Sequence, residues 1–156
     1  MLIQPTALRD FVTKLFTRAG ATGVVAGEVA EHLVEANLKG HDSHGIGMIP
    51  AYVRNIKVGH LDVQAHASVI RDSGAVVLID GHHGFGQVVG REATDIAIAR
   101  VKETGVVCLG LRNAHHLGRI GSYGEPAVAQ AWYQCISSTW SDMNRGFPRG
   151  ADANGA

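Results

Sequence analysis

The sequence predicts an α/β protein, in which helices at the N-terminus precede a small sheet with further helices. Three observations support this fold class. Apolar residues repeat with the helical period of about 3.6 over residues 5–19 and 24–39. Short β-rich runs follow within 67–80 and at 106–111, on either side of another long helical pattern. Polar loops that contain histidine interrupt this order in two places.

The helical segments can be bounded from their end signals. The first is predicted over residues 5–19, with Thr6 as its cap and Gly20 at its end. The second covers 24–39 and ends at a glycine, and a short third covers 49–58 with a proline in its first turn. The first two helices therefore lead the chain into a loop at residues 41–44.

The sheet is predicted from shorter patterns. Residues 67–71 and 75–80 form a hairpin around the turn sequence Asp-Ser-Gly at 72–74. Residues 106–111 are continuously apolar, as in a strand covered on both faces. A long helix spans 86–102 and a last one 121–131, and the segment 132–156 has no period and is expected to be irregular.

Composition excludes several classes of protein. The 156 residues suffice for one domain or for part of a larger protein, and 14 basic residues balance 14 acidic ones. This balance argues against nucleic acid or an anionic membrane as the main partner. No apolar run approaches the roughly 20 residues that span a bilayer, and no secretion signal is recognisable. Two cysteines without disulfide spacing are typical of a cytoplasmic protein.

The loop at residues 41–44 concentrates groups that transfer protons. Two imidazoles, one carboxylate and one hydroxyl stand together in His41, Asp42, Ser43 and His44. Histidine is a side chain that can accept and release a proton near neutral pH, and Asp42 or Ser43 could orient the ring of His44. The alternative is that these polar residues only cap helix ends. The pattern alone leaves both interpretations open.

Two further patterns have competing interpretations. His41 and His44 with His115 and His116 could bind a metal, as in a metal-dependent hydrolase, but they lack the spacing typical of zinc sites. The segment G-F-G-Q-V-V-G at 84–90 is one residue too long for a dinucleotide fingerprint. Glycines that allow close packing of a helix explain it equally well. The adjacent His82 and His83 are expected in a solvated loop.

Three strings together resemble a known family. They are G-H-D-S-H-G-I-G-M-I-P-A-Y at 40–52, G-F-G-Q-V-V-G-R-E-A at 84–93 and N-A-H-H-L-G-R-I-G at 113–121. The chain resembles the malate/L-lactate dehydrogenase family over residues 8–131, and within it the hydroxycarboxylate dehydrogenase B branch. The resemblance implies a mixed-sheet, non-Rossmann NAD(P)-binding fold similar to sulfolactate dehydrogenase. The predicted divisions are 1–60, helical with the histidine loop; 61–131, a partial NAD(P)-binding domain; and 132–156, an irregular tail.

The resemblance also implies roles for particular residues. His44 would be the proton donor or acceptor beside the substrate carbonyl, and His116 would be a second catalytic histidine. Ser43 and Met48 would contact the substrate. Many members have an arginine at the position of Met48, so methionine favours a bulkier, more apolar acid than malate. By the same resemblance, the cofactor-binding residues would be His116, Gly118 and Arg119.

The implied activity is hydride transfer between NAD(P)H and a 2-oxo or 2-hydroxy acid such as phenylpyruvate, lactate or malate. The cofactor would be NAD or NADP, no metal is implied, and the full-length form would be a homodimer. The alternatives to this oxidoreductase activity are a metal-dependent hydrolase that uses the histidine loops and a non-catalytic dimerising remnant.

Residue 132 marks a departure from the family pattern, where a buried strand of the type V-S-x-H-F-V-N-V-V-G is expected. Codons for 132–144 read from their third base can encode V-S-V-H-F-V-N-V-V-G-H-E-P. We therefore expect that this chain is a frameshifted, truncated reading of a dehydrogenase gene. We also expect that the chain as given is inactive alone.

Overall fold

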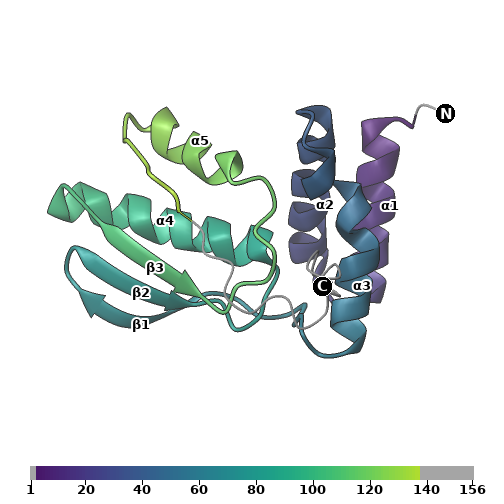
Figure 1. Ribbon diagram of the computed structural model, residues 1–156, viewed down its shortest axis with the longest axis horizontal. Coiled ribbons are helices and arrows are strands. Elements are labelled where there is room, and N and C mark those ends of the chain that lie inside the picture. Colours follow the sequence, from purple (N-terminus) through teal and green to yellow (C-terminus); the bar gives the residue numbers. More distant parts are fainter. Residues whose placement is uncertain (1–2, 138–156) are drawn as a thin grey trace, which may run out of the picture.

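The computed structural model describes residues 3–137 and divides them into two parts (Figure 1). Helices α1, α2 and α3 form one part, here called the helical unit. The strands β1–β3 with helices α4 and α5 form the other, here called the sheet unit. This arrangement confirms the predicted α/β class, with helices first and a small mixed sheet after them.

The helical unit begins with α1, Pro5–Arg18, and α2, Gly23–Leu38. Thr22 caps α2, because its side chain accepts a hydrogen bond from the Val25 N–H. The predicted cap of α1 was wrong: Gln4 occupies the cap position and Thr6 lies inside the helix, since Pro5 already supplies the first turn. Two 3₁₀ turns, Asp42–His44 and Ile46–Met48, then lead into α3, Ile49–Lys57.

The sheet has the order β1-β2-β3, with β1 at Ser68–Ser73, β2 at Val76–Asp80 and β3 at Cys108–Arg112. The first pair is the predicted hairpin, but its turn begins two residues and ends one residue later than the predicted 72–74. Ser73 pairs with Val76, so the turn consists of Gly74, at φ 69°, and Ala75. A glycine with positive φ therefore fixed the turn in place of the Asp-Ser pair.

The strand β3 pairs in parallel with β2 and, within residues 3–137, forms an edge of the sheet. The expectation of cover on both faces was wrong. Leu109 and Leu111 are half-buried in a cluster that includes Ile96 of α4 (Gly86–Thr104), whereas Cys108 and Arg112 are exposed. The helix α4 covers one face only, so an apolar run did not by itself specify a central strand.

The two units share a core at the start of α4, Gly86–Thr104. Phe85 and Val88 belong to the same buried cluster as α1 and α2, and the Phe85 ring meets that of Phe16 edge-on with 5.1 Å between centroids. The helix α5, Gly121–Ala129, packs beside α4, and residues 132–137 contain no helix or strand. The rest of the predicted irregular tail lies outside the described residues. Of the helices in residues 3–137, none has the length and apolar content to cross a membrane.

Candidate active site

The first histidine loop is held by the last turn of α2. Asn37 donates a hydrogen bond from its amide to the Asp42 carboxylate and accepts one from the Ile46 N–H at 2.8 Å. Gly45 lies directly against this amide, and a Cβ at that position would overlap Asn37. One side chain therefore fixes both ends of the 3₁₀ turn that contains His44.

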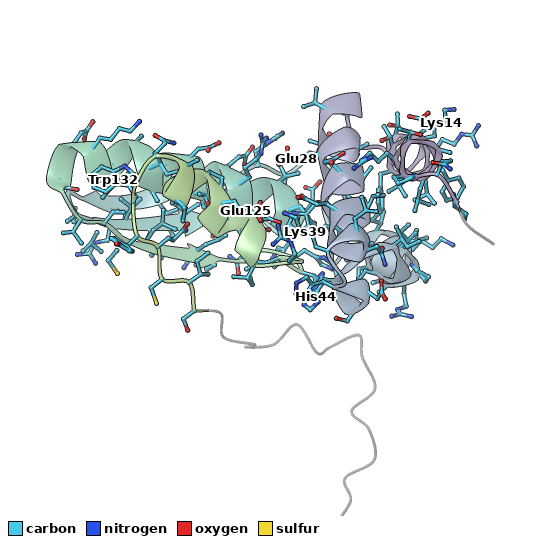
Figure 2. The ribbon with its side chains drawn as sticks, turned by 90° about the horizontal axis from the view of Figure 1, so that it is seen from above. Lys14, Glu28, Lys39, His44, Glu125 and Trp132 are labelled. Carbon is cyan, nitrogen blue, oxygen red and sulfur yellow. The ribbon has the colours of Figure 1, made fainter. Side chains whose placement is uncertain are left out.

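The imidazole of His44 is oriented by its neighbour in the sequence. Ser43 Oγ lies 2.8 Å from His44 Nδ1, so Ser43 is the residue that orients the ring, whereas Asp42 contacts Asn37. His44 is half-buried, at the point where the chain leaves α2 and on the side that faces the sheet unit (Figure 2). The other ring nitrogen, His44 Nε2, has no hydrogen bond within residues 3–137.

The second histidine loop, residues 113–120, is attached to the end of β2. Asp80 accepts hydrogen bonds from the His82 backbone, the Asn113 amide and Arg112 Nε. These donors, the His82 N–H first, lower the pKa of Asp80 to about 2. The carboxylate thus binds the loop before α4 to the loop after β3.

Close contact with α4 fixes the path of this loop. The His115 N–H donates to Gly84 O at 3.0 Å, and a Cβ on Gly86 would overlap the carbonyl oxygens of His115 and His116. The glycines of the 84–90 string therefore allow a loop to lie against the helix start. Of the two explanations offered by the sequence, close packing is the one that this geometry supports.

The imidazole of His116 is buried and is held from α3. Its Nδ1 lies 2.8 Å from the Tyr52 hydroxyl, which in turn accepts a hydrogen bond from Gln87 Nε2 at 2.6 Å. The rings of His116 and His44 stack with their centroids 5.3 Å apart and an angle of 25° between planes. The fold thus brings together the two histidines predicted as catalytic.

Burial sets the charge of the second loop. Desolvation first, and then the neighbouring His44 and His32, lower the pKa of His116 to about 4. Desolvation with the adjacent His116 likewise lowers the pKa of His115 to about 4. Both rings are therefore neutral at pH 7. Burial also raises the pKa of the Tyr52 hydroxyl above its usual range, so it stays protonated.

His115 lies apart from the pair, although it adjoins His116 in the sequence. Its Nε2 accepts from the Asn55 amide at 2.8 Å, and its ring meets that of Tyr52 edge-on. Within residues 3–137 no group of three or more His, Cys, Asp or Glu side chains could hold a metal ion. The four histidines of the metal-hydrolase interpretation therefore do not form a ligand set.

The remaining predicted site residues are placed around the pair. Gly118, at φ 73°, packs against His32, whose Nε2 accepts the Arg119 N–H at 3.0 Å. The Arg119 side chain is 11% exposed and pairs with Glu125 at 2.7 Å. Met48 is half-buried against the core of the helical unit. His82 and His83 are exposed, as predicted.

Sequence reasoning assigned no role to four residues that hold the site: His32, Asn37, Tyr52 and Gln87. Tyr52 and Gln87 stand inside the strings that resemble the family, so a signal was present. His32 is a histidine on an otherwise apolar helix face, which is a weaker signal. Burial of His32, with the Arg119 charge as a second cause, lowers its pKa to about 4.

Comparison with known proteins identifies the family and the fold. The profile described as malate/L-lactate dehydrogenase matches residues 3–146, and the chain belongs to this family. It is 44% identical over 122 residues to hydroxycarboxylate dehydrogenase B of Escherichia coli O157:H7, covering 78% of this chain and 34% of that protein. It is 39% identical over 130 residues to the L-lactate dehydrogenase of Cupriavidus necator, covering 83% of this chain and 37% of that protein.

A solved structure of a dehydrogenase is also similar to this chain. The sulfolactate dehydrogenase of Methanocaldococcus jannaschii superposes with a TM-score of 0.79 at 35% identity, over 83% of this chain and 38% of that chain. The chain therefore spans little more than a third of the length of its relatives. These relatives are named as dehydrogenases, in agreement with the family resemblance found in the sequence.

Proposed function

We propose that this chain provides the histidine pair of an NAD(P)H-dependent oxidoreductase that interconverts 2-oxo and 2-hydroxy acids. The observation that supports it is the stacking of His44 on His116 at 5.3 Å, from loops far apart in the sequence. A hydroxyl contacts Nδ1 of each ring, so Nε2 of each is the nitrogen left for a substrate. Two imidazoles directed at one carbonyl oxygen suit proton transfer to that oxygen.

The two histidines differ in the role we assign to them. His116 is neutral at pH 7 because burial lowers its pKa to about 4, so it orients the substrate oxygen by a hydrogen bond. His44 is half-buried and exchanges the proton. A proton donor placed in this way typically accelerates a reaction by about 10²–10⁴-fold. Ser43 holds the His44 ring and contacts the substrate.

The residues of this site supply protons but no electrons, so the reaction needs a hydride donor. We propose Gly118 and Arg119, with His116, as residues that hold the nicotinamide cofactor. Arg119 Nε supports this assignment, since it is a buried N–H without a hydrogen-bond partner in residues 3–137. When bound, NAD(P)H would supply the hydride to the 2-oxo carbon. Assays with NADH and with NADPH in parallel distinguish the two cofactors.

Met48 supports a substrate with an apolar side chain. It packs partly into the helical unit and ends the 3₁₀ turn after His44, so it has no charge to offer a second carboxylate. We therefore propose phenylpyruvate, ahead of lactate or malate, as the substrate. In an active form of the enzyme, Met48→Arg should move the preference towards a dicarboxylic 2-oxo acid. An unchanged ratio of kcat/KM values for the two acids would contradict this role.

We also propose that the activity requires more than these 156 residues. In the full-length form, a different segment would follow Ala131, and that form would be a cytoplasmic homodimer. The edge of β3, which has no further strand beside it within residues 3–137, and the exposed thiols of Cys108 and Cys135 support these proposals. Sequencing the locus tests the frameshift: an intact frame through codon 132, without a family-like continuation in another frame, would reject it. Light scattering of the restored protein tests the dimer.

The function itself is tested with a chimera. Residues 1–131 are joined to the C-terminal remainder of the E. coli hydroxycarboxylate dehydrogenase B, which is 44% identical over the aligned 122 residues. We expect NAD(P)H-dependent reduction of phenylpyruvate by the chimera and little or none by chain 1–156. Turnover by the 156-residue chain alone would contradict the proposed incompleteness, and an inactive, folded chimera would contradict the proposed function.

A further inference from the structure

We propose that Tyr52 and Gln87 are positioning residues that fix the tautomer of His116, with its proton on Nε2. The inference rests on the proposed function, since it specifies which atom of His116 the substrate oxygen meets. It is carried by a chain of three buried side chains from α3, α4 and the second loop. Neither Tyr52 nor Gln87 need touch the substrate in this arrangement.

The first step concerns the Tyr52 hydroxyl. The side chain is fully buried, and within residues 3–137 the hydroxyl has two partners, Gln87 Nε2 at 2.6 Å and His116 Nδ1 at 2.8 Å. An amide nitrogen only donates, so the hydroxyl oxygen accepts from Gln87. The hydroxyl proton then has His116 Nδ1 as its one acceptor, and a buried hydroxyl that lost this partner would be destabilising.

The second step concerns the imidazole. A nitrogen that accepts a hydrogen bond has no proton, and a neutral imidazole has its single proton on the other nitrogen. His116 is neutral at pH 7 because burial and the neighbouring His44 oppose its charging. The accepted bond at Nδ1 therefore places the proton on Nε2. The chain of hydrogen bonds runs in one direction, from Gln87 through Tyr52 to His116.

This direction separates the two histidines by function. With a proton on Nε2, neutral His116 donates a hydrogen bond to the substrate oxygen and has no lone pair there to remove a proton. The proton that is transferred must then come from, or return to, His44, which stacks on His116. A proton on Nδ1 of His116 would give the reverse result, with Nε2 free to act as the base.

The tautomer can be measured on the 156-residue chain without substrate or cofactor. The protein is labelled with ¹⁵N-histidine, and long-range ¹H–¹⁵N spectra at pH 7.5 distinguish protonated from unprotonated ring nitrogens. His116→Gln assigns the signals by their loss. We expect an unprotonated Nδ1 and a protonated Nε2 for His116, and the reverse pattern would overturn the inference.

Two variants test whether Tyr52 and Gln87 set this state. Tyr52→Phe removes the donor to Nδ1, and Gln87→Met removes the amide that directs the hydroxyl proton. Each should move the nitrogen shifts of His116 towards a mixture of tautomers, and unchanged shifts in the folded variants would overturn the inference. Gln87→Met keeps the test available if Tyr52→Phe does not fold, as judged by thermal melting.

Tyr123→Phe is the matched control. Tyr123 is also a buried tyrosine, but its hydroxyl donates to backbone oxygens, including Gly86 O at 3.1 Å. The nitrogen chemical shifts of His116 should not change in this variant. A change as large as in Tyr52→Phe would show that Tyr52 acts only through packing and does not set the tautomer. Because no turnover is measured, the outcome is separate from that of the chimera assay, which tests the proposed function.

Discussion

The two histidine loops are built by different means. The loop with His44 is short-range: Ser43 orients the ring, and Asn37, a few residues before it, fixes the turn. The loop with His116 is held by residues distant in the sequence, namely Tyr52 and the start of α4. The difference indicates that the first loop can form from its own segment, whereas the second requires the assembled core.

The largest expected effect is a dependence of folding stability on pH, caused by buried histidines in and beside the second loop. His32, His115 and His116 have pKa values of about 4, against 6.5 unfolded. The folded state therefore binds fewer protons than the unfolded state between these values, so stability is complete above pH 6.5 and is lost as pH falls towards 4. Each histidine should contribute about 1.4 kcal/mol per pH unit.

Urea unfolding of chain 1–156 at pH 7, 6 and 5 measures this slope. His116→Gln should reduce it by about one histidine's share, that is about 1.4 kcal/mol per pH unit. A free energy of unfolding that stays constant between pH 7 and 5 would show that these imidazoles are not held neutral by burial.

The second effect compares a glycine from each loop region. A Cβ on Gly86 would overlap backbone oxygens of the second loop, which cannot move without the loop, so Gly86→Ala should cost about 3 kcal/mol. A Cβ on Gly45 would overlap only the Asn37 side chain, which can rotate away if it gives up its two hydrogen bonds, so Gly45→Ala should cost about 1–2 kcal/mol. Urea midpoints measure both.

Gly27→Ala is the control for these substitutions. Gly27 lies within α2 with no atom near its Cβ position, so alanine there should stabilise the chain by about 0.5–1 kcal/mol. Equal losses from Gly86→Ala and Gly45→Ala would contradict the different construction of the two loops.

The smallest effect is local to the first loop. Asn37→Ala removes the bond to the Ile46 N–H and the bond to Asp42, and should cost about 1–2 kcal/mol. Hydrogen exchange should become faster at Ile46 while the amide of His115, which donates to Gly84 O, keeps its protection. Faster exchange at both amides would show that the loops are not independent.

The sequence predicted the parts of this molecule that depend on local pattern. The 3.6-residue period found α1 and α2 within two residues of their observed ends, and the polar cluster pointed to His44. The misplaced hairpin turn had a local cause, the positive φ of Gly74. The partial exposure of β3 had a non-local cause, because the cover of a strand depends on what packs against it.

The site shows the same division. The family resemblance gave His44 and His116 catalytic roles, and the metal-site interpretation also grouped them, but neither predicted that their rings stack, since no spacing relates residues that meet through tertiary contacts. Tyr52 and Gln87 could not be assigned roles from sequence alone, because their function lies in a hydrogen-bonded chain across two helices. Buried polar networks of this kind become visible only when the fold is known.

The most direct test of the account is a double-mutant cycle in the chimera, with kcat/KM for phenylpyruvate as the readout. If His44 and His116 act on one carbonyl, His44→Ala should reduce kcat/KM by about 10²–10⁴-fold, and adding His116→Ala should cost far less than the product of the single losses. His83→Ala, at an exposed histidine outside the pair, should leave the rate unchanged. Full turnover with His44→Ala, or single losses that simply multiply, would contradict a shared site.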